Sequence, residues 1–170
     1  MSIHFKSQDI SVKKLVSKTM SELEVGMQGR YSKTLSERDI VLFGETSGDL
    51  NPVHFDDDYA AGTIFKTRIA HGMWSAGLIS TCIGTVMPGP GSIYLGQTLE
   101  FKSVVKPGDE LTATATIKEK QRKILIIDCE VRNQRGEVVV SGEAKVMPPR
   151  KAAEVEIPQL PSIKVEGLDA

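Results

Sequence analysis

The chain has 170 residues, a formal net charge of −1, and 40% hydrophobic and 25% charged residues. This length and composition suit one globular domain with a well-buried core and some extra chain at the ends. The nearly neutral charge argues against nucleic acid or an anionic membrane as the main partner, and no signal peptide or membrane-length apolar run is present in the sequence.

The chain is expected to divide into three parts. Residues 1–19 are polar and weakly periodic, which predicts a loose N-terminal arm. The folded domain is expected over residues 20–148. Prolines punctuate the polar residues 149–170, a composition typical of a linker or a disordered tail.

The first part of the domain is expected to hold one strand and two short helices. Alternating residues predict a strand from Gln28 to Leu35. The segment Ser36–Asp39 resembles a capping box, which starts a helix through Phe43. Gly44–Asp49 is expected to end this helix. The acidic start of Asp57–Ala61 favours a second helical turn.

A long helix is predicted next, from His71-Gly72 to about Val86. Its residues are apolar or small on nearly every face, which is typical of a helix surrounded by protein. The segment Pro88–Gly91 is expected to stop it abruptly.

The remaining half of the domain is predicted to be β-structure. Alternating apolar residues and short turns indicate four strands, at Ile93–Val105, Glu110–Lys118, Ile124–Asn133 and Val138–Met147. Strands joined in this way predict an antiparallel meander. With the buried helix they predict an α+β domain, in which a curved antiparallel β-sheet wraps around a long central α-helix.

The segment Ser47–Asp56 carries the clearest chemical signal. It places the carboxylate of Asp49 and the imidazole of His54 five residues apart, on a bend where Gly48 permits backbone angles closed to other residues and Pro52 fixes its own φ. Such a bend can aim both groups at one water molecule, which is suited to proton transfer near neutral pH. A structural explanation stays open, with Asp49 capping a turn and His54 hydrogen-bonded in a loop.

A second candidate lies at the predicted helix start. The free N–H groups of a helix N-terminus can stabilise a carbonyl oxygen that becomes an oxyanion, and Gly72 would let a ligand approach closely. For His71, a structural role near the helix start is the favoured explanation.

Other chemistries have weaker support. A metal site at His54, Asp56, Asp57 and Asp58 lacks further ligands at a diagnostic spacing, so no metal is expected. No Gly-X-Ser-X-Gly segment indicates a serine hydrolase. The two cysteines lie far apart in apolar runs, which predicts buried, reduced thiols in a cytoplasmic protein.

Three segments together resemble one family. Ser47–Asp56, Ile69–Met73 and Gly91–Gln97 are similar, in this order, to motifs of the (R)-specific enoyl-CoA hydratases of the MaoC-like dehydratase family, which has the hot-dog fold. The resemblance covers residues 20–148. It implies reversible syn hydration of a trans-2-enoyl-CoA to an (R)-3-hydroxyacyl-CoA.

The resemblance also implies roles for individual residues. Asp49 and His54 match the catalytic pair that holds the reacting water, and the N–H of Gly72 matches the oxyanion donor. A second group is implied to bind the substrate or to shape its site, namely Asn51, His71, Ser80 and Ile83.

The resemblance implies a homodimer with an acyl-CoA thioester as its substrate. It implies no cofactor, because coenzyme A enters as part of the substrate. The extra arm and tail leave open that the chain is the N-terminal hydratase domain of a longer bifunctional acyl-CoA or acyl-phosphate enzyme. Two further alternatives stay open, a hot-dog acyl-CoA thioesterase and a non-catalytic acyl-CoA-binding module.

Overall fold

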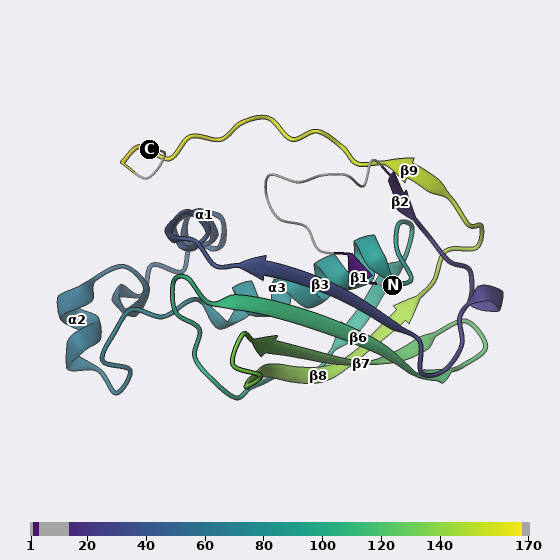
Figure 1. Ribbon diagram of the computed structural model, residues 1–170, viewed down its shortest axis with the longest axis horizontal. Coiled ribbons are helices and arrows are strands. Elements are labelled where there is room, and N and C mark those ends of the chain that lie inside the picture. Colours follow the sequence, from purple (N-terminus) through teal and green to yellow (C-terminus); the bar gives the residue numbers. More distant parts are fainter. Residues whose placement is uncertain (1, 4–13, 168–170) are drawn as a thin grey trace.

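A curved sheet wraps around one central helix in the computed structural model, which describes residues 2–3 and 14–167 (Figure 1). The seven-stranded sheet has the order β1-β3-β6-β7-β8-β4, and β5 also pairs with β8. Every strand pair in it is antiparallel except β1 with β3. The predicted α+β class, with the sheet around a long helix, is confirmed.

The elements have the following bounds. The sheet consists of β1 (Ser2–Ile3), β3 (Gln28–Thr34), β4 (Ile93–Gln97), β5 (Glu100–Phe101), β6 (Glu110–Lys120), β7 (Leu125–Asn133) and β8 (Val138–Met147). The helices are α1 (Glu37–Ser47), α2 (Asp57–Gly62) and α3 (Gly72–Thr81), which continues as a π-helical turn over Cys82–Val86. Short 3-10 turns cover Met20–Glu22 and Pro52–His54, and β2 (Lys14–Val16) pairs with β9 (Glu154–Glu156).

The core lies between α3 and the inner face of the sheet. Strand β6 contributes a row of residues with no more than 1% exposure, namely Leu111, Ala113, Ala115 and Ile117. This is the inward set that the alternation predicts. The two alanines leave room for the helix to approach the sheet closely.

The predicted meander is correct for β6, β7 and β8, but wrong for the strand before them. The segment predicted as one strand over 93–105 is two short strands, and both pair with β8 rather than with β6. The chain then leaves the sheet, and the Ala70 N–H donates to the Val105 carbonyl at 2.7 Å. Because residue 105 lies beside the start of α3, β6 is free to pair with β3.

Helix α1 begins as the capping box predicts and ends later than its apolar residues suggest. Ser36 Oγ accepts the Asp39 N–H at 3.1 Å, and Asp39 Oδ2 accepts the Ser36 N–H at 3.0 Å. The helix ends at Gly48, which has a φ of 75° and donates its N–H to the Gly44 carbonyl. A residue without a side chain is favoured there.

Helix α3 begins at Gly72 as predicted, but one of its faces is exposed. Met73 is 55% exposed, and the same face carries three small exposed residues, Gly77, Ser80 and Gly84. The expectation that protein surrounds this helix is therefore wrong for the single chain. Because the side chains on this face are small, a hydrophobicity pattern does not show that the face is exposed.

The arm and the tail meet outside the sheet. Strands β2 and β9 form a two-stranded antiparallel ribbon, and the Ser17 N–H donates to the Ala153 carbonyl at 2.9 Å. The tail then crosses above α1 (Figure 1), where the Arg38 guanidinium donates to the Ile163 carbonyl. Most of the predicted arm, residues 1 and 4–13, lies outside the described residues, and the three-part division stays a prediction.

In the described part of the chain, no helix is both long and apolar enough to cross a lipid bilayer.

The crossing of Thr98 over β8 predicts a strict requirement for Gly142. A Cβ at Gly142 would lie 1.8 Å from the Thr98 carbonyl oxygen, so Gly142→Ala must displace backbone. We expect a loss of about 2–4 kcal/mol in the free energy of unfolding, measured by urea denaturation. Gly62→Ala is the control, because nothing lies within 4 Å of its Cβ position. Equal stability of the two variants would contradict this account of β8.

Candidate active site

The bend after α1 is held by its own side chains. The Asn51 N–H donates to Asp49 Oδ1 at 3.2 Å, and the Val53 N–H donates to Asn51 Oδ1 at 3.3 Å. Pro52 begins the short 3-10 turn that ends at His54. With Oδ1 bound to the bend, Asp49 keeps Oδ2 available, and its side chain is 53% exposed. Asn51 therefore shapes the bend.

His54 presents one defined nitrogen to Asp49. Its Nδ1 lies 2.8 Å from the Ile69 carbonyl, which only accepts hydrogen bonds, so Nδ1 carries the proton. In the neutral ring Nε2 then has the free lone pair. Nε2 lies 3.9 Å from Asp49 Oδ2, which is too far for a direct hydrogen bond. The two groups can both bind an oxygen placed beside them.

His71 contacts both members of this pair. Its ring stacks on that of His54 with centroids 3.8 Å apart and an interplanar angle of 29°. Its Nε2 lies 2.9 Å from the Asp49 carbonyl oxygen and therefore donates to it. Burial lowers the pKa of His71, although the hydrogen bond to Asp49 favours the protonated ring.

Gly72 is the first residue of α3 and lines a small cavity. As the first residue of the helix, it has an N–H without an acceptor inside the helix. The cavity has a volume of about 140 Å³, and its lining includes Gly72, Ser75, Phe101 and Val105. A Cβ at Gly72 would lie 2.9 Å from the Phe101 ring. Only glycine leaves this approach open.

Ser75 is a polar residue of the cavity that the sequence analysis missed. It is buried, and among the described residues its hydroxyl has no hydrogen-bond partner. The available signal was its spacing, because a residue three positions after Gly72 lies on the same helix face. A buried hydroxyl without a partner can bind a polar ligand atom.

The remaining sequence-predicted residues lie apart from this cavity. Ser80 is on the exposed face of α3, and Ile83 is in the core. Neither lines the cavity beside Gly72. Their roles in binding an acyl chain stay predictions.

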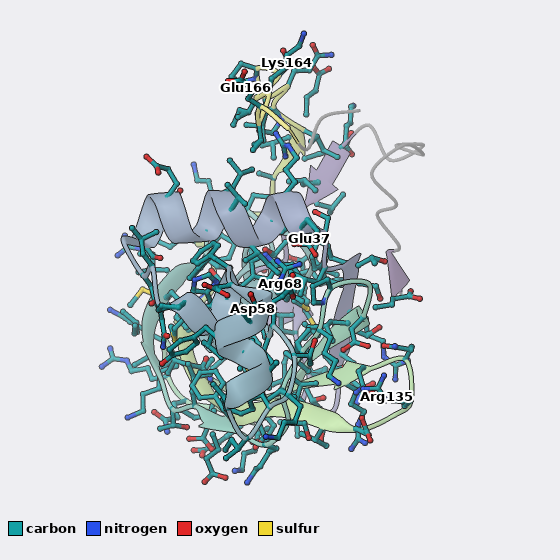
Figure 2. The ribbon with its side chains drawn as sticks, turned by 90° about the vertical axis from the view of Figure 1, so that its left-hand side faces the viewer. Glu37, Asp58, Arg68, Arg135, Lys164 and Glu166 are labelled. Atoms are coloured by element: carbon teal, nitrogen blue, oxygen red, sulfur yellow. The ribbon has the colours of Figure 1, made fainter. Side chains whose placement is uncertain are left out.

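Arg68 is a second feature that the sequence analysis missed. Its guanidinium binds both oxygens of Glu37 on α1, each at 2.9 Å, and its Nε binds Asp57 on α2 at 2.8 Å. These contacts raise the pKa of Arg68 further above its already high value. Figure 2 shows Arg68 and Glu37 side by side beneath α1. Arg68 therefore ties together the two helices that flank the bend.

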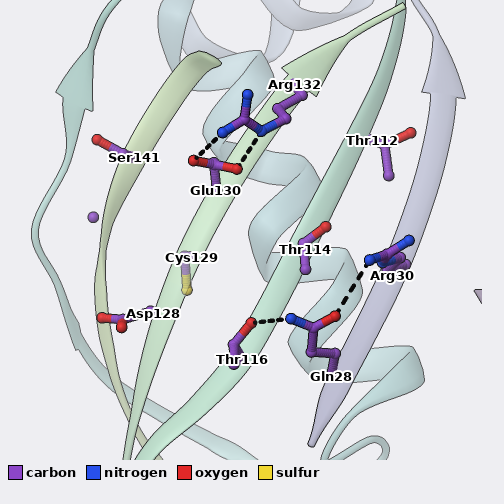
Figure 3. Close-up of a pocket in the computed structure, with 11 residues that line it drawn as sticks. Gln28, Arg30, Thr112, Thr114, Thr116, Asp128, Cys129, Glu130, Arg132 and Ser141 are labelled. Carbon is purple, nitrogen blue, oxygen red and sulfur yellow. Dashed lines mark hydrogen bonds and ion pairs between the residues drawn. The ribbon is translucent and has the colours of Figure 1, made fainter. Parts of the chain in front are cut away.

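A larger hollow lies elsewhere, on the outer face of the sheet, and has a volume of about 560 Å³. Figure 3 shows Thr112, Thr114 and Thr116 on this face, with the Glu130–Arg132 ion pair above Cys129. The hollow shares no residue with the bend or with α3. The hollow therefore lies apart from Asp49, His54 and Gly72.

A metal ion fits these residues poorly. Potential ligand atoms of Asp49, His54 and His71 lie within 4.8 Å of one another. An imidazole binds a metal in its own plane, at about 2.1 Å. Because the two rings stack at 3.8 Å, one ion cannot lie in both planes at that distance.

Two of the acidic residues that follow His54 make contacts within the protein instead of forming a metal site. Asp56 accepts the Tyr59 N–H at the start of α2, and Asp57 binds Arg68. The alternative metal set of His54 with Asp56, Asp57 and Asp58 is not among the clusters formed by the described residues.

The cysteines are free and buried as predicted, and burial raises the pKa of Cys82 and of Cys129 to about 12. Both thiols are therefore protonated at neutral pH.

Comparison with known proteins gives consistent matches. The MaoC-like domain family matches residues 18–139. An (R)-specific enoyl-CoA hydratase of Rhodospirillum rubrum is 45% identical over 146 residues, which cover 84% of this chain and 99% of that protein. A 3-hydroxybutyryl-CoA dehydratase of Methylorubrum extorquens is 44% identical over 134 residues, 76% of this chain and 83% of that protein.

Solved structures agree with these relatives. The unliganded R-hydratase PhaJ1 of Pseudomonas aeruginosa superposes with a TM-score of 0.86 and 48% identity, over 89% of this chain and 99% of that chain. The (R)-hydratase of Aeromonas caviae, described as involved in PHA biosynthesis, gives a TM-score of 0.72 and 42% identity. The match covers 75% of this chain and 98% of that chain.

The link made by Arg68 predicts a measurable contribution to stability. Arg68→Gln removes the paired hydrogen bonds to Glu37 and the contact with Asp57. We expect a loss of about 1–2 kcal/mol in the free energy of unfolding, which shrinks at high salt because the carboxylates are partly exposed. Urea denaturation at two ionic strengths measures it, with the exposed Arg122→Gln as control. A loss no larger than that of the control would contradict the link.

Proposed function

The chain belongs to the MaoC-like domain family, and from this premise we propose that it is an (R)-specific enoyl-CoA hydratase. It adds water reversibly, in the syn sense, to a trans-2-enoyl-CoA and forms an (R)-3-hydroxyacyl-CoA. One observation carries the proposal at the level of this chain's own residues. Nε2 of His54, which holds the free lone pair when the ring is neutral, and the available Oδ2 of Asp49 lie 3.9 Å apart, beside the N-terminus of α3.

The separation of these two atoms suits a shared water. An oxygen at ordinary hydrogen-bond length from both would see them at an angle of about 90°, within the range that a water molecule accepts. The lone pair on His54 can accept one water proton, and the Asp49 carboxylate can accept the other. Both acceptors then increase the electron density on the water oxygen.

Hydration at C3 needs a place for negative charge. As the water oxygen bonds to C3, the electron pair of the double bond moves toward the thioester carbonyl oxygen. The N–H of Gly72, at the positive end of α3, can donate to this oxygen. The enolate then collapses, and C2 takes a proton from the Asp49/His54 pair. Because the two groups are coupled, the protons belong to the pair.

The proposal needs no cofactor, since coenzyme A is part of the substrate. A cytoplasmic location is also part of the proposal, and two free, buried cysteines support it.

We further propose that the protein is a homodimer. Two exposed apolar features of the single chain support it. The first is the exposed face of α3, and the second is the edge strand β4, where Leu95 is 48% exposed and Ile93 is also exposed. An open, apolar sheet edge is a site for pairing with a second copy.

Substitution of the catalytic pair tests the reaction. With crotonyl-CoA as substrate, we expect Asp49→Asn and His54→Gln each to lower kcat by roughly 10²–10⁴-fold with a smaller change in KM. Loss of enoyl absorbance measures the rate, and chiral analysis identifies the product. Asp58→Asn, a change of an exposed carboxylate on α2, is the control.

Three results would overturn this function. They are no hydration by the wild-type chain, an (S)-configured product, and full activity in both variants. Release of free thiol without hydration would indicate a thioesterase instead.

A charge on β4 tests the dimer. Leu95→Glu places a carboxylate on the exposed edge strand, and we expect it to convert a dimer into a monomer in analytical ultracentrifugation. Ile64→Glu is the control, because Ile64 is 88% exposed and lies between α2 and α3. A monomeric wild type, or a Leu95→Glu variant that stays dimeric, would refute the proposed interface.

A further inference from the structure

We propose that His71 is a positioning residue that holds Asp49 and His54 in register with the N-terminus of α3, and that it does not touch the substrate. This inference rests on the proposed function, because it assigns His71 a part in that reaction. Three separate contacts carry it.

The first contact fixes the backbone of Asp49. Nε2 of His71 donates to the Asp49 carbonyl oxygen at 2.9 Å, across 22 residues of sequence. Asp49 directly follows the left-handed Gly48, at the point where α1 has ended. Its side chain is 53% exposed, and its hydrogen bond to the Asn51 N–H lies within the bend and does not anchor the bend to another element. The hydrogen bond from His71 therefore fixes the backbone position from which the Asp49 carboxylate extends.

The second contact fixes the ring of His54. The two imidazoles stack at 3.8 Å, and the hydrogen bond from His54 Nδ1 to the Ile69 carbonyl holds the ring in its own plane. Phe55 meets the His54 ring edge-on at 6.1 Å. A ring covered on one face and bonded at one edge cannot turn freely. Its Nε2 therefore stays directed toward Asp49.

The third contact places His71 itself. It is the residue before Gly72 and occupies the N-cap position of α3, with Phe43 packed at 4.9 Å on its ring. The residue that holds the water-binding pair is thus joined directly to the residue whose N–H faces the carbonyl oxygen. A small shift of His71 would move both halves of the site relative to each other.

Burial argues against direct contact between His71 and a substrate. The residue is only 2% exposed, and it is not among the residues that line the cavity beside Gly72. Its Nδ1 is buried and, within the described part of the chain, has no hydrogen-bond partner. A residue needed only for packing would not bury such a nitrogen. The atom of His71 that acts in the site is Nε2, whose N–H donates to the Asp49 carbonyl oxygen.

Protonation of His71 would disturb this arrangement. Burial lowers the pKa of His71, which favours the neutral ring, and the hydrogen bond to the Asp49 carbonyl places the proton of that ring on Nε2. A cationic ring stacked on His54 would oppose the transfer of a proton to His54 during the reaction. A neutral donor ring avoids that repulsion.

Two substitutions separate the contribution of the His71 ring, which stacks on His54, from that of its N–H donor. His71→Phe keeps an aromatic ring against His54 but removes the donor, whereas the amide of His71→Gln can place an N–H near the position of Nε2. We expect kcat for crotonyl-CoA to fall roughly 10–100-fold in His71→Phe, with KM changed less than about threefold. His71→Gln should recover part of this loss.

Ile127→Val is the matched control. It removes one methylene from a fully buried core residue of β7 that is not among the residues lining the cavity beside Gly72, so it lowers stability without changing His71 or its hydrogen bond to Asp49. We expect it to lower the unfolding midpoint but to leave kcat within about threefold of the wild type. A purely structural role of His71 would instead make the loss of kcat follow the loss of stability in all three variants, which would overturn the proposal.

Other outcomes are equally decisive. Unchanged kcat in a folded His71→Phe variant, or a His71→Gln variant no better than it, would overturn the role of Nε2–H. A rise in KM of tenfold or more with unchanged kcat would make His71 a substrate contact.

A measurement without substrate separates this inference from the proposed function. The chain has three histidines, so nitrogen NMR of the wild-type imidazoles can be assigned by substitution. We expect a neutral His71 protonated on Nε2 and a His54 protonated on Nδ1. If these tautomers are found but crotonyl-CoA is not hydrated, the function fails and the arrangement stands. If hydration occurs with His71 protonated on Nδ1, the inference on His71 fails alone.

Discussion

Helix α3 is packed against the inner face of the sheet, and the position of every other part of the site follows from that contact. Ala113 and Ala115 of β6 have no exposed surface and hold the sheet close to the helix. Larger residues on either side, such as Ile79 and Ile127, fill the remaining volume. Because the helix cannot slide in a close-packed core, its N-terminus is fixed at one end of the sheet.

The groups of the proposed site are brought to that helix end from separate segments. The bend after α1 carries Asp49 and His54, and the segment before α3 supplies the Ile69 carbonyl and His71. Arg68 links α1 to α2 around them. The proposed water-binding pair and the proposed oxyanion donor are therefore held by one continuous set of hydrogen bonds and packed rings.

Three of the buried polar residues, His54, His71 and Ser75, lie together near the start of α3. Two of them contain a buried polar atom without a partner among the described residues. Such groups cost free energy in a folded protein, and proteins retain them mainly where they serve binding or catalysis. Their concentration near the start of α3 agrees with the location of the proposed reaction.

The sequence by itself determined the features that depend on neighbouring residues. Alternation identified β6, β7 and β8, the Ser36/Asp39 pair located the start of α1, and His71-Gly72 located the start of α3. The same local reasoning selected Asp49 and His54, because Gly48 permits the turn before them and Pro52 restricts the few residues between them. Only the tertiary structure decided the pairing of β4 and β5 with β8, the exposed face of α3, the link made by Arg68, the buried hydroxyl of Ser75 and the stacking of His71 on His54. Each of these depends on contacts between segments far apart in the chain, and neither periodicity nor capping patterns record which distant segments meet.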